Sequence, residues 1–72
     1  MALLKVSVLY DDEVPLGAIY AGLRNAGMDI RRTHESICIL TGTIEDTQMS
    51  AAAEVDGVEE IEVQREVQAY EL

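Results

Sequence analysis

The stretch Ser36-Ile37-Cys38-Ile39-Leu40-Thr41-Gly42-Thr43-Ile44 decides the fold, because it is apolar on both of its alternating faces. A strand of this kind is typical of the middle of a sheet, where neighbouring layers cover it. Gly42 within it indicates a bulge or a point where another backbone comes close. We therefore expect residues 36–44 to form a central strand, in which Cys38 is a small buried hydrophobic side chain.

The residues upstream predict a strand, a helix and a charged strand. Residues 3–10 alternate, and their apolar face consists of Leu4, Val6, Val8 and Tyr10. Residues 15–26 carry an apolar stripe at helical spacing, made of Leu16, Ile19, Tyr20 and Leu23. Gly27 follows where a left-handed helix cap is expected. The segment from Met28 to Glu35 becomes strongly polar after Ile30, which favours the edge of a sheet.

The residues downstream predict a second helix and a last strand. Glu45, Asp46 and Thr47 supply the residue types that begin helices. A narrow apolar stripe follows, made of Met49, Ala52, Ala53 and Val55, and Gly57 ends the helix. From Val58 to Tyr70 every second residue is mainly apolar, as in Ile61, Val63, Val67 and Ala69. Arg65 interrupts this face, and we interpret it as the point where the strand leaves the body of the domain.

The order strand, helix, strand, strand, helix, strand predicts an α+β fold of the ferredoxin-like βαββαβ class. Such a sandwich has a four-stranded antiparallel sheet with two helices on one face, and its first and third strands are central. The two most charged strands, the second and the fourth, then fall at the edges. We expect one domain, residues 1–72, with residues 66–72 as an extended C-terminal tail.

Charge and composition exclude several partners. The net charge is −9, from 14 acidic and 5 basic residues, and from Glu45 onward there are nine acids and one base. A basic stripe that would neutralise phosphates is missing, so we expect no nucleic-acid binding and no attraction to anionic membranes. The sequence has neither a signal-peptide pattern nor an apolar run of membrane-spanning length, which predicts a cytoplasmic protein.

Groups that perform catalysis are scarce. The chain has one histidine, His34, one lysine, Lys5, and one cysteine, Cys38. We interpret His34 as a solvated edge residue and Lys5 as a residue on the polar face of the first strand. The acids of residues 11–13 are consecutive and do not by themselves supply a metal ligand set. We therefore predict a protein that is not an enzyme and needs neither a metal nor a cofactor.

The end of the chain carries a family resemblance. Asp56-Gly57-Val58-Glu59-Glu60-Ile61-Glu62, followed by Val67-Gln68-Ala69-Tyr70, resembles the end of the subtilisin propeptide family, which includes free-standing peptidase inhibitors. The chain also resembles short bacterial proteins of this size whose function is unsettled. The first resemblance implies a ferredoxin-like inhibitor or folding assistant that binds a subtilisin-like serine protease through the open face of its sheet.

The same resemblance implies roles for single residues. The tail, Val67, Gln68, Ala69 and Tyr70, would lie in the substrate cleft like a cleaved product, with Tyr70 at the primary specificity pocket. Glu62 matches an acid that caps a helix N-terminus of the protease, whereas Gln64 stands where a second acid is common. Glu71 and Leu72 follow Tyr70, so Leu72 is an alternative occupant of the pocket.

A second function stays open beside the first. Small domains of this fold also act as non-catalytic regulatory modules that bind small molecules or form oligomers. The glycine-rich turn that such modules need near the first helix is poor here, because residues 11–15 contain no glycine. Exposed sheet edges favour a homodimer through edge strands under either hypothesis.

Overall fold

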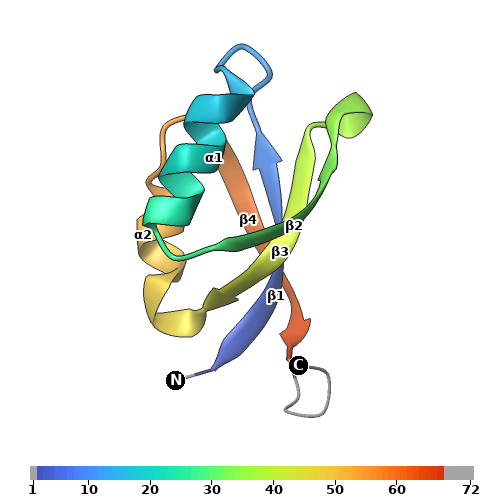
Figure 1. The fold of residues 1–72 in the computed structure, drawn as a ribbon. Coiled ribbons are helices and arrows are strands. Elements are labelled where there is room, and N and C mark those ends of the chain that lie inside the picture. Colours follow the sequence, from blue (N-terminus) through green and yellow to red (C-terminus); the bar gives the residue numbers. More distant parts are fainter. Residues whose placement is uncertain (1, 68–72) are drawn as a thin grey trace.

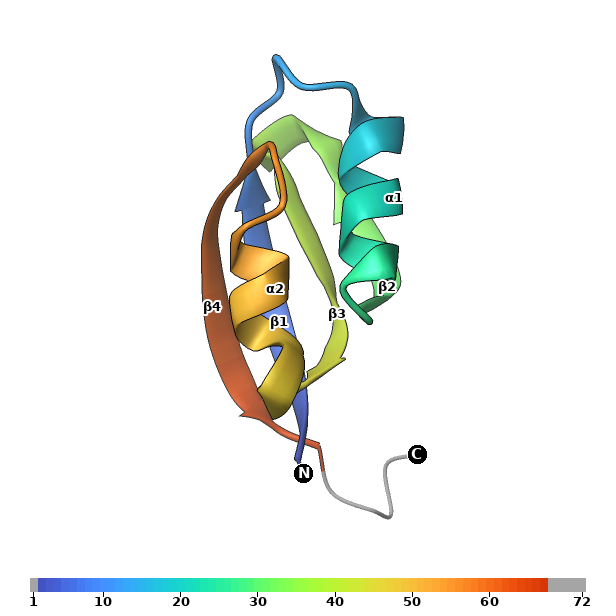
Figure 2. The same cartoon turned by 90° about the vertical axis from the view of Figure 1, so that its left-hand side faces the viewer.

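The computed structural model describes residues 2–67 and has the predicted order of elements. The strands and helices are β1 (Leu3–Tyr10), α1 (Leu16–Asn25), β2 (Asp29–His34), β3 (Ile39–Glu45), α2 (Met49–Ala53) and β4 (Val58–Glu66). The sheet order is β2-β3-β1-β4, and every neighbouring pair is antiparallel. Both helices cover the same face, with α1 toward β2 and α2 toward β4 (Figures 1 and 2). The ferredoxin-like α+β fold is thereby confirmed.

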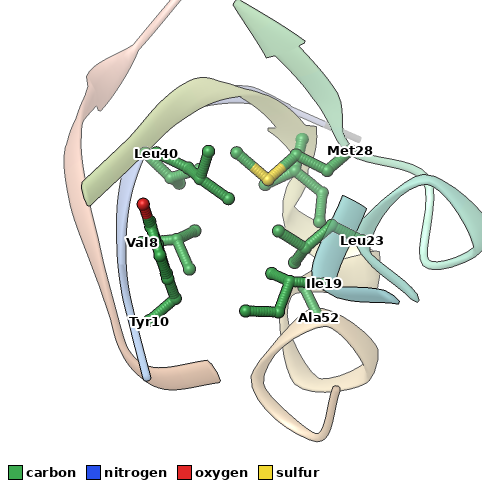
Figure 3. Packing of buried hydrophobic residues seen from close by; sticks show 9 residues of the cluster. Val8, Tyr10, Ile19, Leu23, Met28, Leu40 and Ala52 are labelled. Carbon is green, nitrogen blue, oxygen red and sulfur yellow. The ribbon is translucent and has the colours of Figure 1, made fainter. Parts of the chain in front are cut away.

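The core fills the space between the sheet and the helices. Side chains of β1 and β3 point toward those of α1 and α2, as Figure 3 shows. The buried hydrophobic residues are Val6, Val8, Tyr10, Ile19, Leu23, Met28, Leu40, Ile44 and Ala52. None of the described buried residues is polar or charged, so hydrophobic burial and packing supply most of the stabilisation. The predicted apolar faces of the first strand and the first helix are therefore correct.

The C-terminus of α1 has the expected left-handed cap. Gly27 has φ +99°, and its N–H donates to the carbonyl of Arg24 at 2.9 Å. The N–H of Met28 donates to the carbonyl of Leu23, also at 2.9 Å. These two bonds form a Schellman motif, which a glycine completes at little steric cost.

The second helix and the central strand are shorter than predicted. A 3₁₀ turn at Asp46–Gln48 leads into α2, whose regular part has five residues. Another 3₁₀ turn, at Glu35–Ile37, occupies the start of the stretch that we expected to be a strand, and the side chain of Ile37 is 59% exposed. The chain must reverse between β2 and β3, and these residues make that reversal.

Cys38 ends the reversal and is not the buried residue that the sequence predicts. It has φ 56°, in the left-handed region, and its N–H donates to the carbonyl of Glu35 at 3.3 Å. Its side chain is half-buried. An L-residue other than glycine, asparagine or aspartate is unfavourable in this conformation. The local turn, rather than core packing, therefore decides the environment of Cys38.

A β-bulge in β4 corrects the interpretation of Arg65. Val63 lies opposite Val6, but Arg65 lies opposite Lys5, so Gln64 is an extra residue on β4. The bulge reverses the alternation of the faces beyond it. β4 therefore continues past Arg65 to Glu66, and the N–H of Val67 donates to the carbonyl of Leu3 at 2.8 Å.

A second bulge lies on the opposite edge strand. Ile30 pairs with Gly42 and Arg32 pairs with Thr41, so Arg31 is the extra residue on β2. A Cβ atom at position 42 would collide with the backbone carbonyl oxygen of Asp29. The close backbone approach predicted at Gly42 is thus correct, and the bulge lies on β2 beside it.

The close approach at Gly42 predicts a steep cost for adding a methyl group. We expect Gly42→Ala to destabilise the domain by about 2–3 kcal/mol, because backbone must move to make room. Gly17→Ala is the matched control: a Cβ there meets nothing within 4 Å, and Gly17 lies in α1. This control should stabilise by about 0.5 kcal/mol through helix propensity. Urea unfolding measures both, and equal effects would contradict the register of β2 on β3.

The positive φ of Cys38 predicts that glycine is tolerated better at this position than a larger apolar residue. We expect Cys38→Val, which keeps an apolar side chain, to destabilise by about 1–2 kcal/mol, since a β-branched residue is strained at positive φ. Cys38→Gly should stay within about 0.5 kcal/mol of the parent, because relief of strain offsets the flexibility of glycine. Thermal unfolding of the two variants decides the matter; a valine variant more stable than the glycine variant would show that packing dominates at this position.

Candidate functional site

The candidate site is the face of the sheet that the helices leave uncovered. Cross-strand pairing arranges it in three rows. Leu9 lies between Ile39 and Glu60, Ser7 between Thr41 and Glu62, and Lys5 between Thr43 and Arg65. Directly opposed side chains are about 5 Å apart at Cβ, so each row forms a continuous strip. We call this surface the open face.

One end of the open face is acidic and partly apolar. A shallow hollow of about 110 Å³ is lined by Ser7, Leu9, Ile39, Glu60 and Glu62. Leu9 is 36% exposed, a large value for a leucine in a central strand. Glu60 and Glu62 are exposed. We call these five residues the acidic end.

The other end of the open face is basic. A pocket of about 380 Å³ is lined by Leu3, Lys5, Arg31, Arg32, Thr41, Gly42, Thr43, Arg65 and Val67. Four of its lining residues are cationic and none is acidic. Arg31 contacts Asp29 at 3.1 Å, Nε to Oδ2, in an exposed ion pair. We call this hollow the basic pocket.

Of the predicted tail, the structure describes only Val67. Val67 lies at the rim of the basic pocket and is joined to β1 by the hydrogen bond to Leu3. Gln68, Ala69 and Tyr70 lie outside the described residues. Glu62 lies on the open face opposite Ser7, on the same strand that leads to Val67. The helix-capping role of Glu62 and the cleft-binding role of the tail remain predictions.

The other candidate residues do not come together. His34, expected to be solvated, is half-buried at the end of β2, opposite Ile39. A carboxylate oxygen of Asp11 accepts a hydrogen bond from the N–H of Glu13 at 2.9 Å, which stabilises the turn after β1. Within residues 2–67, no three His, Cys, Asp or Glu side chains converge as a metal site would require.

Sequence reasoning missed the basic pocket. Its cations, Lys5, Arg31, Arg32 and Arg65, come from β1, β2 and β4, three segments that are far apart in the chain. The β2 and β4 segments reach the pocket through bulges. Simple alternation places Arg65 on the helix-covered face. The available signal was that an arginine on an otherwise apolar face of an edge strand is also typical of a bulge that reverses the face.

Tyr10 is the one described group with an altered titration. Burial at the end of β1 raises the pKa of its phenol above the usual value, and the nearby Cys38 and Glu35 add to the increase. The cause is desolvation of the phenolate, with repulsion from neighbouring negative charge as the smaller effect.

The raised pKa of Tyr10 predicts a loss of stability in alkali. Unfolded tyrosine ionises near pH 10, whereas folded Tyr10 holds its proton to higher pH. The unfolded state therefore releases its proton first, so the stabilisation is fully present below about pH 10 and is lost as the pH rises further. Tyr10→Phe should unfold with a weaker dependence on pH in this range. Parallel slopes for the two proteins in urea titrations would contradict the expectation.

These features define a small ferredoxin-like domain with an uncovered, charge-divided sheet face. Neither α1 nor any other helix within residues 2–67 has the length and hydropathy needed to cross a bilayer. Comparison with family models, with curated proteins and with solved structures finds no match for this chain. The case for a function therefore depends on the chain's own residues.

Proposed function

We propose that the protein is a non-catalytic inhibitor or folding assistant of a subtilisin-like serine protease. It docks through the acidic end of the open face and presents its C-terminal tail to the substrate cleft. The observation that carries the proposal is the course of β4. This edge strand displays Glu60 and Glu62 on the uncovered face and is followed by Val67, whose N–H is bonded to Leu3.

The carboxylates of the acidic end are suited to bind a protein surface that presents helix N-termini. A helix N-terminus carries partial positive charge and unsatisfied N–H donors, and both are satisfied by a carboxylate. Glu60 and Glu62 are exposed on one face of β4. Leu9 and Ile39 lie beside them and would lose water on docking, which adds a hydrophobic contribution.

The tail then binds by strand addition. An extended segment bound in a protease cleft gains affinity from main-chain hydrogen bonds and specificity from alternate side chains. The bond between Val67 and Leu3 anchors the start of this segment to the domain. A fixed starting point lowers the entropy that the tail loses when it binds. The hydrogen bond of Val67 thus fixes the point from which the proposed tail begins.

The tail is tested by removing residues 68–72 and keeping Val67, so that the bond to Leu3 is retained. Inhibition of a subtilisin is measured with a chromogenic peptide substrate, and circular dichroism verifies the fold. We expect the truncated protein to lose inhibition by about a hundredfold or more, because the cleft contacts supply most of the affinity. Equal inhibition by both proteins, or by neither, would refute the proposal.

Glu62 is tested against a matched neighbour. Glu62→Gln should weaken inhibition by about 1–2 kcal/mol, the scale of a charged helix cap. Glu59→Gln removes the same charge from an exposed position of β4 that has no partner on β1, since Leu9 pairs with Glu60 and Tyr10 with Val58, and that does not line the acidic end; it should leave inhibition unchanged. If both substitutions weaken inhibition equally, net charge rather than a contact at Glu62 is responsible.

A further inference from the structure

We infer that the basic pocket binds a small, multiply charged anion, either a phosphorylated compound or a polycarboxylate. The inference is independent of protease binding and concerns the opposite end of the open face. Its first support is the distribution of charge. The chain has only five basic residues against 14 acids, and four of the five line this pocket. The fifth, Arg24, lies in α1 with its guanidinium 6.0 Å from the centre of the Tyr20 ring.

Cations dispersed for solubility do not produce such a cluster. Like charges brought together repel one another, so a bound anion would lower the electrostatic energy of the cluster. The overall negative charge does not prevent local binding, because physiological salt screens charges beyond about 8 Å. An anion inside the pocket would contact the four lining cations directly, whereas the nearest carboxylates, Asp29 and Glu62, do not line the pocket.

The backbone is shaped to bring these cations together. The bulge at Gln64 places Arg65 beside Lys5 on the open face, where regular alternation would have turned it to the helix side. The bulge at Arg31 allows two consecutive arginines to line the same pocket. Bulges of this kind redirect side chains and are common beside binding sites. Two independent bulges, one on each edge strand, thus supply three of the four cations.

The lining groups suit phosphate or carboxylate oxygens. Arginine offers five N–H donors in a planar fork, and lysine adds a compact charge. Thr41 and Thr43 contribute hydroxyl groups that can donate from the floor of the pocket. The ion pair of Arg31 with Asp29 is exposed, with 67% and 64% of the two side chains accessible. Such a pair is weak and leaves donors of Arg31 for a ligand.

The size and surroundings favour a compact ligand over a polymer. A volume of about 380 Å³ lies toward the small end of ligand pockets. Asp29 lies in the row of Lys5 and Arg65, and Glu62 lies in the row of Arg32, but neither carboxylate lines the pocket. An extended polyanion would run along these rows and meet both carboxylates, whereas a small anion needs contacts only with the lining residues.

The test is a titration of the intact protein, followed by amide chemical shifts and by calorimetry at constant ionic strength. The probes are inorganic phosphate and citrate, which separate the phosphoryl source from the polycarboxylate source. We expect at least one probe to bind at low millimolar concentration or tighter, with shifts confined to the strands around Lys5, Arg32, Thr41 and Thr43. Binding of neither probe, or shifts spread evenly over the surface, would overturn the inference.

Matched variants make the result specific. Arg32→Gln and Lys5→Gln should each weaken binding about tenfold or more, the loss expected for one charged hydrogen bond. Arg24→Gln removes the same charge outside the pocket and should leave the affinity unchanged. Equal losses of affinity for Arg24→Gln and Arg32→Gln would show that the net charge of the protein, rather than the pocket, determines binding, and would overturn the inference. Because no protease is present, failure here is distinguishable from failure of the proposed inhibition.

Discussion

The pairing of β1 with β3 on one side and β4 on the other is the constraint on which the rest of the structure depends. Val6 and Val8 are fully buried, so β1 can present only its alternate residues to the open face. Both helices pack on the valine side, which leaves Lys5, Ser7 and Leu9 without a covering layer. In a domain this small, one helix layer and one sheet form the whole core, and the second face of the sheet is available for binding.

The bulge at Gln64 follows from the same constraint. Val63 is held opposite Val6, and the next pair along β1, Arg65 with Lys5, lies on the other face, so β4 needs one extra residue between them. Bulges interrupt the hydrogen-bond ladder, and an edge strand tolerates this better than a central strand. They also twist and interrupt edges that would otherwise pair with other chains. The geometry that protects the edges therefore also collects positive charge on the open face.

The sequence predicts those parts of the fold in which local chemistry and packing agree. Each of three patterns predicts a single kind of local structure. They are the alternation of Val6 and Val8, the helical stripe ending at Leu23 and the cap at Gly27. The pattern gives the wrong environment for Cys38, because an apolar run does not reveal a left-handed turn inside it. The pattern also gives the wrong position for Arg65, because a bulge shifts the alternation without changing the residue types. Register is a property of paired strands, so a single strand's sequence does not contain it.

The candidate site was therefore predictable at its acidic end and not at its basic end. Glu62 lies before the bulge, where alternation from Ile61 still holds, whereas the cations depend on two register shifts.

The acidic end and the basic pocket are close to each other. Ser7 and Lys5, which mark their rows on β1, are separated by roughly 7 Å, two residues of extended strand. This is within the screening length of physiological salt. An anion in the basic pocket would offset the nearby cations and so strengthen the negative potential at Glu60 and Glu62. By thermodynamic linkage, a partner that presents positive helix ends to the acidic end would then favour the anion-bound protein, and the anion would favour that partner.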